Sequence, residues 1–143
     1  MTSPIATARP DFLLHTYYRS SCSARLRIAL NLKAIPAEYA YVHLFKGEQQ
    51  SPEHRRLNPS ASVPVLTHLV HPSFPITQSI AALEYLEEIF PDQTPLLPPM
   101  SQPFERAKVR TLVNIISNDV QPVTNRRIVQ AVGALGGDPQ QWS

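Results

Sequence analysis

The chain has 143 residues, 43% of them hydrophobic, which is enough to form a folded core and excludes a disordered chain. Its formal net charge of +2, with Lys and Arg scattered along the sequence, excludes a basic nucleic-acid-binding tract. The single cysteine excludes an internal disulfide and a Cys-x-x-Cys metal or dithiol site, and no apolar run approaches the ~20 residues of a membrane-spanning helix.

The N-terminal third of the chain predicts a tail followed by a strand, a helix and a second strand. Residues 1–10 lack the apolar segment of a secretory leader and are expected to be a flexible tail. Phe12 to Thr16 has the pattern of a buried strand, and Ser21 to about Lys33 that of an amphipathic helix. Glu38 to Leu44 alternates between polar and apolar residues, which predicts a second strand.

The next part of the chain completes an α/β pattern. Ser51-Pro52-Glu53 combines an N-cap serine, a proline and an acid, which is typical of a short helix start. Val65–Val70 and Pro75–Thr77 predict a pair of short strands, and Ser79–Phe90 predicts an amphipathic helix. The order β-α-β-α-β-β-α across residues 11–90 is that of a thioredoxin-like α/β domain.

The remaining residues predict a linker and then helices. Residues 91–103 contain five prolines and are expected to be the linker. A long helix is expected from about Phe104, with Pro122 dividing or kinking it and three glycines ending the helical run. We therefore expect residues 104–143 to form an incomplete all-helical domain.

A run of small polar residues, Ser20-Ser21-Cys22-Ser23, stands where the first strand gives way to the first helix. Free backbone N–H groups and the helix dipole at such a start favour negative charge. A thiolate is stabilised there, whether it belongs to Cys22 or to a bound thiol cofactor. The alternative is that Ser20 and Ser21 are simply N-caps and Cys22 is a buried residue on the helix face.

This run also carries a resemblance to a known family. The signature of the zeta-class glutathione transferases, the maleylacetoacetate isomerases, is similar to Ser20-Ser21-Cys22-Ser23-x-Arg25-x-Arg27-Ile28-Ala29-Leu30. The similarity continues in family order through Gly47-Glu48-Gln49-Gln50, Leu57-Asn58-Pro59, Val63-Pro64-Val65-Leu66, Gln78-Ser79, Glu84-Tyr85-Leu86-Glu87-Glu88 and Gln121-Pro122-Val123-x-Asn125. Because family members carry a helical second domain of several helices, the resemblance implies that this sequence is a C-terminally truncated member.

The resemblance implies a glutathione site. Its catalytic residues would be Ser20, Ser21 and Cys22, with the Ser21 hydroxyl donating to the thiolate and Cys22 modulating it. Glutathione would contact Ser20, Ser21, Cys22, Ser23, Arg25, Gln50, Val63, Pro64, Gln78, Ser79, Gln121, Asn125 and Arg127. No metal ligand is expected, because the five histidines show no ligand spacing on a single helix.

Individual roles follow from the same resemblance. Val63 would pair with the cysteinyl unit of glutathione next to a cis Pro64, although an ordinary trans proline is the alternative. Ser79 and the helix that it begins would bind the γ-glutamyl carboxylate, unless Ser79 is only an N-cap. Gln50 would contact the glycyl end.

Two polar side chains and two arginines have further expected roles. Gln121 and Asn125 would share a helix face if Pro122 permits. Arg127 would add positive charge for a dicarboxylate-like substrate, and a solvated surface arginine is the alternative. Arg27 is expected to pair on the surface.

The implied activity is glutathione-dependent cis–trans isomerisation of maleylacetoacetate in tyrosine and phenylalanine breakdown, together with glutathione transfer. The expected partner is a small acid substrate, with no nucleic acid and no membrane, and the chain is expected to be a cytoplasmic homodimer. Two alternatives stay open. One is an inactive fragment that acts as a glutathione-binding or dimerisation module. The other is monothiol chemistry, in which Cys22 forms a mixed disulfide with glutathione.

Overall fold

The computed structural model describes residues 10–142, so nearly all of the expected tail, residues 1–10, lies outside the described residues. The chain divides into two compact units between Leu96 and Leu97. This division falls inside the proline-rich stretch of residues 91–103. Each unit is described by itself.

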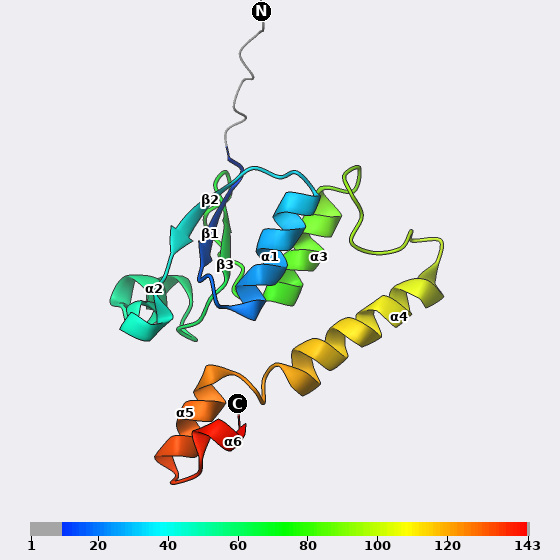
Figure 1. The fold of residues 1–143 in the computed structure, drawn as a ribbon. Helices are drawn as coiled ribbons and strands as arrows, with labels where there is room; N and C mark the ends of the chain where they lie inside the picture. Colours follow the sequence, from blue (N-terminus) through cyan, green and yellow to red (C-terminus); the bar gives the residue numbers. More distant parts are fainter. Residues whose placement is uncertain (1–9, 143) are drawn as a thin grey trace, which may run out of the picture. The chain divides into compact units, whose positions relative to one another are not determined.

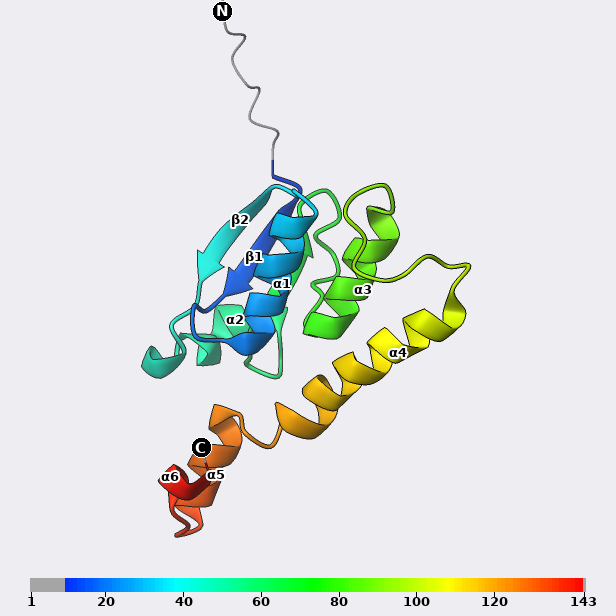
Figure 2. The same ribbon diagram turned by 45° about the vertical axis from the view of Figure 1, so that its right-hand side comes forward.

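The first unit is a mixed three-stranded sheet with helices on both of its faces. The sheet order is β2-β1-β3, with β1 parallel to β2 and antiparallel to β3. Helices α1 and α3 lie side by side on one face and begin at the same end of the sheet, and α2 lies on the other face (Figures 1 and 2). The elements are β1 Phe12–Thr16, α1 Ser21–Leu32, β2 Ala37–Tyr41, the 3-10 turns η1 Leu44–Lys46 and η2 Glu48–Gln50, α2 Pro52–Leu57, β3 Val65–His68 and α3 Ser79–Ile89.

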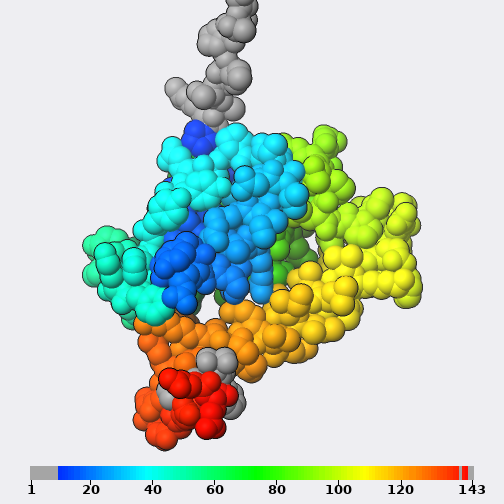
Figure 3. All heavy atoms as spheres, viewed as in Figure 1, coloured from blue at the N-terminus to red at the C-terminus, as the bar shows by residue number. Residues whose placement is uncertain are grey.

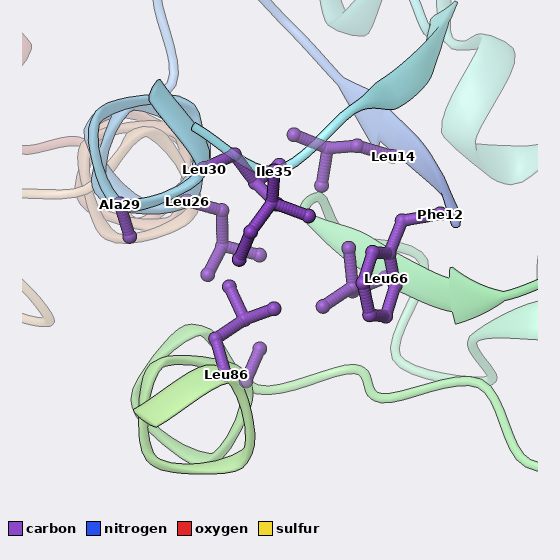
Figure 4. Close-up of a cluster of buried hydrophobic side chains, with 9 residues drawn as sticks. Phe12, Leu14, Leu26, Ala29, Leu30, Ile35, Leu66 and Leu86 are labelled. Atoms are coloured by element: carbon purple, nitrogen blue, oxygen red, sulfur yellow. The ribbon is translucent and has the colours of Figure 1, made fainter. Parts of the chain in front are cut away.

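The core of this unit lies between the sheet and the helix pair α1 and α3. Alternate residues of β1 are buried, as a strand with one face on a core requires. Figure 4 shows Phe12 and Leu66 from the sheet facing Leu26 of α1 and Leu86 of α3. The outer surface of α1, blue to cyan in Figure 3, lies toward the viewer in that picture. The thioredoxin-like α/β domain expected from the element order is confirmed.

The expected fourth strand, Pro75–Thr77, is reduced to a single bridge. Ile76 and Leu66 exchange both backbone hydrogen bonds, at 2.8 and 2.9 Å, but no further pair follows. In an antiparallel ladder the next such pair would join Pro64 to Gln78, and Pro64 has no N–H to donate. The expected strands Glu38–Leu44 and Val65–Val70 are likewise shorter, at Ala37–Tyr41 and Val65–His68.

A buried ion pair joins the ends of α1 and α3. The Lys33 side chain is completely buried, and its Nζ lies 2.8 Å from Oε2 of Glu87 and donates to the Phe90 carbonyl at 3.1 Å. The same Glu87 oxygen accepts a hydrogen bond from the backbone N–H of Leu96 at 2.9 Å. One pair of opposite charges therefore fixes both helix ends and the segment that leaves α3.

The second unit is helical and is interrupted at Pro122, as the sequence predicts. Helix α4, Pro103–Asn114, runs into a π-helical turn, η3, Ile115–Val120. A turn that contains Pro122 follows, because proline has no N–H for the helical ladder. Helices α5, Arg126–Ala134, and α6, Pro139–Trp142, complete the unit.

Candidate functional site

The candidate site begins at the turn between β1 and α1. Ser20 is the N-cap of α1, and its Oγ accepts a hydrogen bond from the backbone N–H of Ser23 at 3.1 Å. Ser21 is the first helical residue and its side chain is exposed, whereas Cys22 is half-buried. The two serines therefore have different roles: Ser20 completes the helix start, and the Ser21 hydroxyl is available to a ligand.

Ser23 does not fit the ligand-contacting role expected for it. Its side chain is completely buried, and its backbone N–H is already bonded to Ser20. The spacing of the residues explains the difference, because the third residue of an amphipathic helix that begins at Ser21 turns toward the core. In the described part of the chain, the buried Ser23 Oγ has no hydrogen-bond partner.

Arg27 holds this turn from within α1, a role that the sequence analysis missed. Its guanidinium donates to Thr16 Oγ1 at 2.8 Å, to the Tyr17 carbonyl at 3.1 Å and to the Tyr18 carbonyl at 3.3 Å. The Tyr17 carbonyl also accepts from the backbone N–H of Ser20 at 3.0 Å. The expectation that Arg27 pairs on the surface is therefore wrong. Arg27 instead positions the loop that leads to Ser20. Helical side chains lean toward the helix N-terminus, and this rule could have revealed the role.

The start of α3 forms the second part of the site. Gln78 is the N-cap, but its side chain makes no capping hydrogen bond. Ser79, the next residue, is buried, and its Oγ accepts a hydrogen bond from Nη1 of Arg25 at 3.0 Å. Arg25 thus connects the N-terminal half of α1 to the first turn of α3, so two of the predicted site segments come together.

The Val63–Pro64 loop is the third part. The peptide bond between Val63 and Pro64 is cis, as the resemblance implied. The carbonyl of the preceding residue, Ser62, lies 2.9 Å from Nε2 of His54 and accepts from Nδ2 of Asn58 at 2.9 Å. His54 and Asn58 therefore position this loop. The Asn-Pro pair and the N-capped start of α2 were the only sequence signals for them.

A second histidine lies beside His54 on the face of the sheet that α2 covers. The ring centroids of His15 and His54 are 6.0 Å apart, and the buried Nδ1 of His15 has no hydrogen-bond partner within residues 10–142. Burial lowers the pKa of His15 below its usual value, and the neighbouring His54 lowers it further. The folded chain therefore keeps His15 neutral under conditions in which an exposed histidine would be charged.

Stability is expected to fall in mild acid because of His15. The unfolded chain binds the proton with an ordinary pKa near 6.5, so unfolding is favoured as the pH drops below that value and until the lower folded pKa is reached. Binding of one proton by the unfolded chain can lower the free energy of unfolding by at most about 1.4 kcal/mol per pH unit. Urea unfolding at about pH 7.5 and about pH 5.5 measures the loss. His15→Phe should show a smaller loss; an equal loss would assign the pH dependence to other groups.

Gln50 lies at the end of η2 and is exposed. Its side-chain oxygen accepts from Nη2 of Arg55, and its carbonyl accepts from Nε of the same arginine at 3.3 Å. Arg55 thus orients this residue. A contact between Gln50 and the glycyl end of glutathione stays a prediction.

The remaining predicted residues, Gln121, Asn125 and Arg127, belong to the second unit. Pro122 does not permit the helix face that Gln121 and Asn125 were expected to share, because the chain turns over residues 121–124 between η3 and α5. Asn125 is instead the N-cap of α5: its Oδ1 accepts from the backbone N–H of Arg127 at 2.9 Å, and its Nδ2 donates to the Pro122 carbonyl at 2.7 Å. Arg127 is exposed in the first turn of α5.

Within residues 10–142, no cluster of three or more His, Cys, Asp or Glu side chains has an arrangement suited to a metal ion. In the same part of the chain, no helix has the length and apolar character needed to cross a bilayer.

Comparisons with known proteins agree with this geometry. Residues 19–89 match the family model described as glutathione S-transferase, N-terminal domain. Over 137 residues the chain is 59% identical to a maleylacetoacetate isomerase of Aspergillus fumigatus, covering 94% of this chain and 59% of that protein. It is 54% identical to a probable glutathione S-transferase of Coccidioides immitis, covering 94% and 62% of the two chains.

Solved structures show the same similarity. A bacterial maleyl pyruvate isomerase, described as a zeta-class glutathione S-transferase, matches with a TM-score of 0.81 and 38% identity, covering 91% of this chain and 60% of that one. A maleylacetoacetate isomerase of Methylobacterium extorquens AM1, solved with malonate and glutathione bound, matches with a TM-score of 0.82 and 34% identity, covering 91% and 59%. The chain thus spans about three fifths of the length of the relatives that it matches.

Proposed function

This chain belongs to the zeta class of the glutathione transferases, and we propose that it binds glutathione and uses it to isomerise a small maleyl-type acid such as maleylacetoacetate. The observation that carries the proposal is the Arg25–Ser79 hydrogen bond, 3.0 Å long, which joins the N-terminal half of α1 to the first turn of α3. It brings a cation and a buried hydroxyl to the end of the unit where Ser20, Ser21 and Cys22 begin α1. A cation and a hydroxyl are both suited to an anionic ligand.

The residues of the first unit fit glutathione chemically. The N–H groups at the start of α3 receive no cap from Gln78, and no acid lies in the first turn, so this end suits a carboxylate. The Ser21 hydroxyl and the start of α1 suit a thiolate, because donation to the charged form lowers a thiol pKa. Val63, next to the cis proline, offers backbone groups to an extended peptide.

The chemistry that bound glutathione supplies is reversible addition of a thiolate to a conjugated cis double bond, after which rotation is possible and the thiolate leaves. The chain's own contribution is to hold the thiol in its charged form at Ser21 and to orient it. We include Cys22 as a neighbour that modulates the thiolate, and Ser20 as the cap that shapes the helix start. Gln121, Asn125 and Arg127 belong to the second unit, and their contacts with a ligand stay predictions.

The test is isomerisation of maleylacetone, a simpler analogue, by the 143-residue chain with and without glutathione. We expect turnover that requires glutathione and is absent with S-methylglutathione, which has no free thiol. Circular dichroism of the same sample checks that the chain is folded. Binding of glutathione by folded protein without any turnover would refute the isomerase proposal and leave a glutathione-binding module.

We further propose that the protein is a cytoplasmic homodimer that acts on a small acid, without nucleic acid or membrane as a partner. The single cysteine supports a reducing compartment. The apolar side chains of Leu112, Ile116 and Val120, which are more than half exposed, support association through the second unit. Sedimentation velocity across a concentration series measures the oligomeric state.

A further inference from the structure

Helix α2 is attached to the sheet through a titratable side chain. Of its residues Pro52–Leu57, all of which the structure describes, His54 alone is buried, with 5% of its surface exposed. A helix of six residues is not stable by itself in water, so α2 depends on its N-cap, Ser51, and on this contact with the sheet. The most deeply buried attachment of the helix is therefore an imidazole.

The His54 side chain contacts two different parts of the sheet layer. Its Nε2 lies 2.9 Å from the Ser62 carbonyl oxygen, and because a carbonyl only accepts, Nε2 carries the proton and donates it. Its ring lies beside that of His15, with 6.0 Å between the centroids. In the register of β1 and β3, His15 is paired with Val65, which directly follows the Val63–Pro64 loop. The two histidines thus lie at the two ends of that loop.

The surroundings of the pair do not favour a positive charge on His15. The neighbouring strands place the uncharged Ala40 and Val65 opposite it, and the histidine of β3, His68, packs on Phe12 at the core face of the sheet. The other charged or titratable side chains near the pair are Glu38 of β2, Glu48 of η2 and Glu53, Arg55 and Arg56 of α2, which are all exposed, and His43, whose ring packs on Tyr17. Among the described residues, no buried acid therefore stands beside His15 to stabilise a proton.

We propose that His15 and His54 form a pH-sensitive switch: in mild acid α2 leaves the sheet, the Val63–Pro64 loop loses the hydrogen bond from His54, and glutathione binds more weakly. This inference rests on the proposed function, since the loop is expected to pair with glutathione. A charged His15 is hydrated only when α2 has left, and it also repels a proton on His54. The Ser62 carbonyl keeps its hydrogen bond from Asn58, so the loss of affinity is partial.

The direction of the pH effect follows from proton linkage. Burial, and then the neighbouring His54, lower the pKa of His15 while α2 covers it. When α2 has left, this pKa returns toward the ordinary value near 6.5. Each pH unit below that value, until the lower pKa is reached, favours the open state by at most about tenfold. Affinity is therefore complete above the ordinary pKa and falls as the pH drops through it.

The experiment is isothermal titration calorimetry of the full chain with S-methylglutathione at about pH 7.5 and about pH 5.5. This ligand has no thiol, so thiolate formation does not contribute to the pH dependence. The variants are His15→Phe, which keeps an aromatic ring, His54→Gln, which keeps an N–H donor for the Ser62 carbonyl, and their double variant. The matched control is His71→Phe, because it removes an exposed histidine of the same unit.

We expect the Kd of the wild type to rise by about three- to tenfold from the higher to the lower pH, since about tenfold is the limit for one histidine over one pH unit. His15→Phe and His54→Gln should each show a smaller rise, and the double variant a rise of less than about twofold. His71→Phe should keep the wild-type rise. Any titration of the ligand itself is common to all variants and cancels in this comparison.

Hydrogen exchange followed by mass spectrometry tests the switch without a ligand. After correction for the intrinsic exchange rate, the amides of α2 should lose protection at the lower pH in the wild type but not in the double variant. The amides of α3 are the internal reference. An equal loss of protection in α3 means that the whole unit unfolds, which contradicts a local switch.

The calorimetry separates failure of this inference from failure of the proposed function. If the wild type binds S-methylglutathione at the higher pH and the Kd does not rise in acid, or rises equally in the double variant, the switch is wrong and the glutathione site stands. If the folded wild type binds neither S-methylglutathione nor glutathione at the higher pH, the proposed function is wrong and this inference is wrong with it.

Discussion

Replacing Ser21 by alanine is expected to reduce glutathione-dependent turnover by about 10- to 100-fold at neutral pH, with little change in stability. The Ser21 side chain is exposed at the first position of α1 and makes no contact needed for folding. Without its hydroxyl, the pKa of the bound thiol should return toward the value near 8.5 of a free thiol. Ultraviolet absorbance of the thiolate, titrated against pH in the bound state, measures this pKa directly.

Ser20→Ala provides the matched comparison, because it removes the same hydroxyl from the preceding residue. Its Oγ accepts from Ser23 N–H as the N-cap of α1, so its loss should cost about 1 kcal/mol of stability. We expect urea unfolding to show the larger loss of stability for Ser20→Ala. The thiol titration should show the larger rise in thiol pKa for Ser21→Ala. If Ser20→Ala shifts the thiol pKa more than Ser21→Ala does, the two roles are reversed.

The helix starts of the first unit could be predicted because their signals are local. Ser20 and Ser51 both accept hydrogen bonds from the third residue beyond them, as the N-cap rule requires. The reduction of the expected fourth strand to a single bridge could not be predicted, because its pairing depends on residues outside the segment itself. Pro64, the residue that ends this pairing, gives no signal in the sequence around Pro75–Thr77.

The candidate site could likewise be predicted only in part. The polar run at the start of α1 and the Gln78-Ser79 helix start are visible in the sequence, and the resemblance connects them. Arg25, by contrast, reaches Ser79 across 54 positions of the chain, so only the packing of α1 against α3 reveals this contact. The sequence predicts the interruption at Pro122, but not that Asn125 becomes the N-cap of α5, which depends on where the helix restarts.

Lys33→Met is expected to destabilise the first unit by about 3 to 5 kcal/mol. Such a loss is a large part of the free energy of unfolding of a typical domain, which is roughly 5–15 kcal/mol. The Lys33 side chain is 0% exposed, and its partner Glu87 is 15% exposed. Methionine fills the space of the lysine stem but leaves the Glu87 carboxylate without its counter-ion. Urea unfolding followed by circular dichroism measures the change.

Two further variants test whether burial of the ion pair is the cause. Lys108→Met makes the same chemical change at the Lys108–Glu105 pair, whose side chains are 55% and 49% exposed, and should cost no more than about 1 kcal/mol. The double variant Lys33→Met/Glu87→Gln removes both charges and should recover part of the stability that Lys33→Met loses, because no charge is then buried alone. Equal losses for Lys33→Met and Lys108→Met would contradict this account. The ends of α1 and α3 would then be held by the apolar core alone, and the buried Lys33–Glu87 pair would add no more stability than an exposed pair.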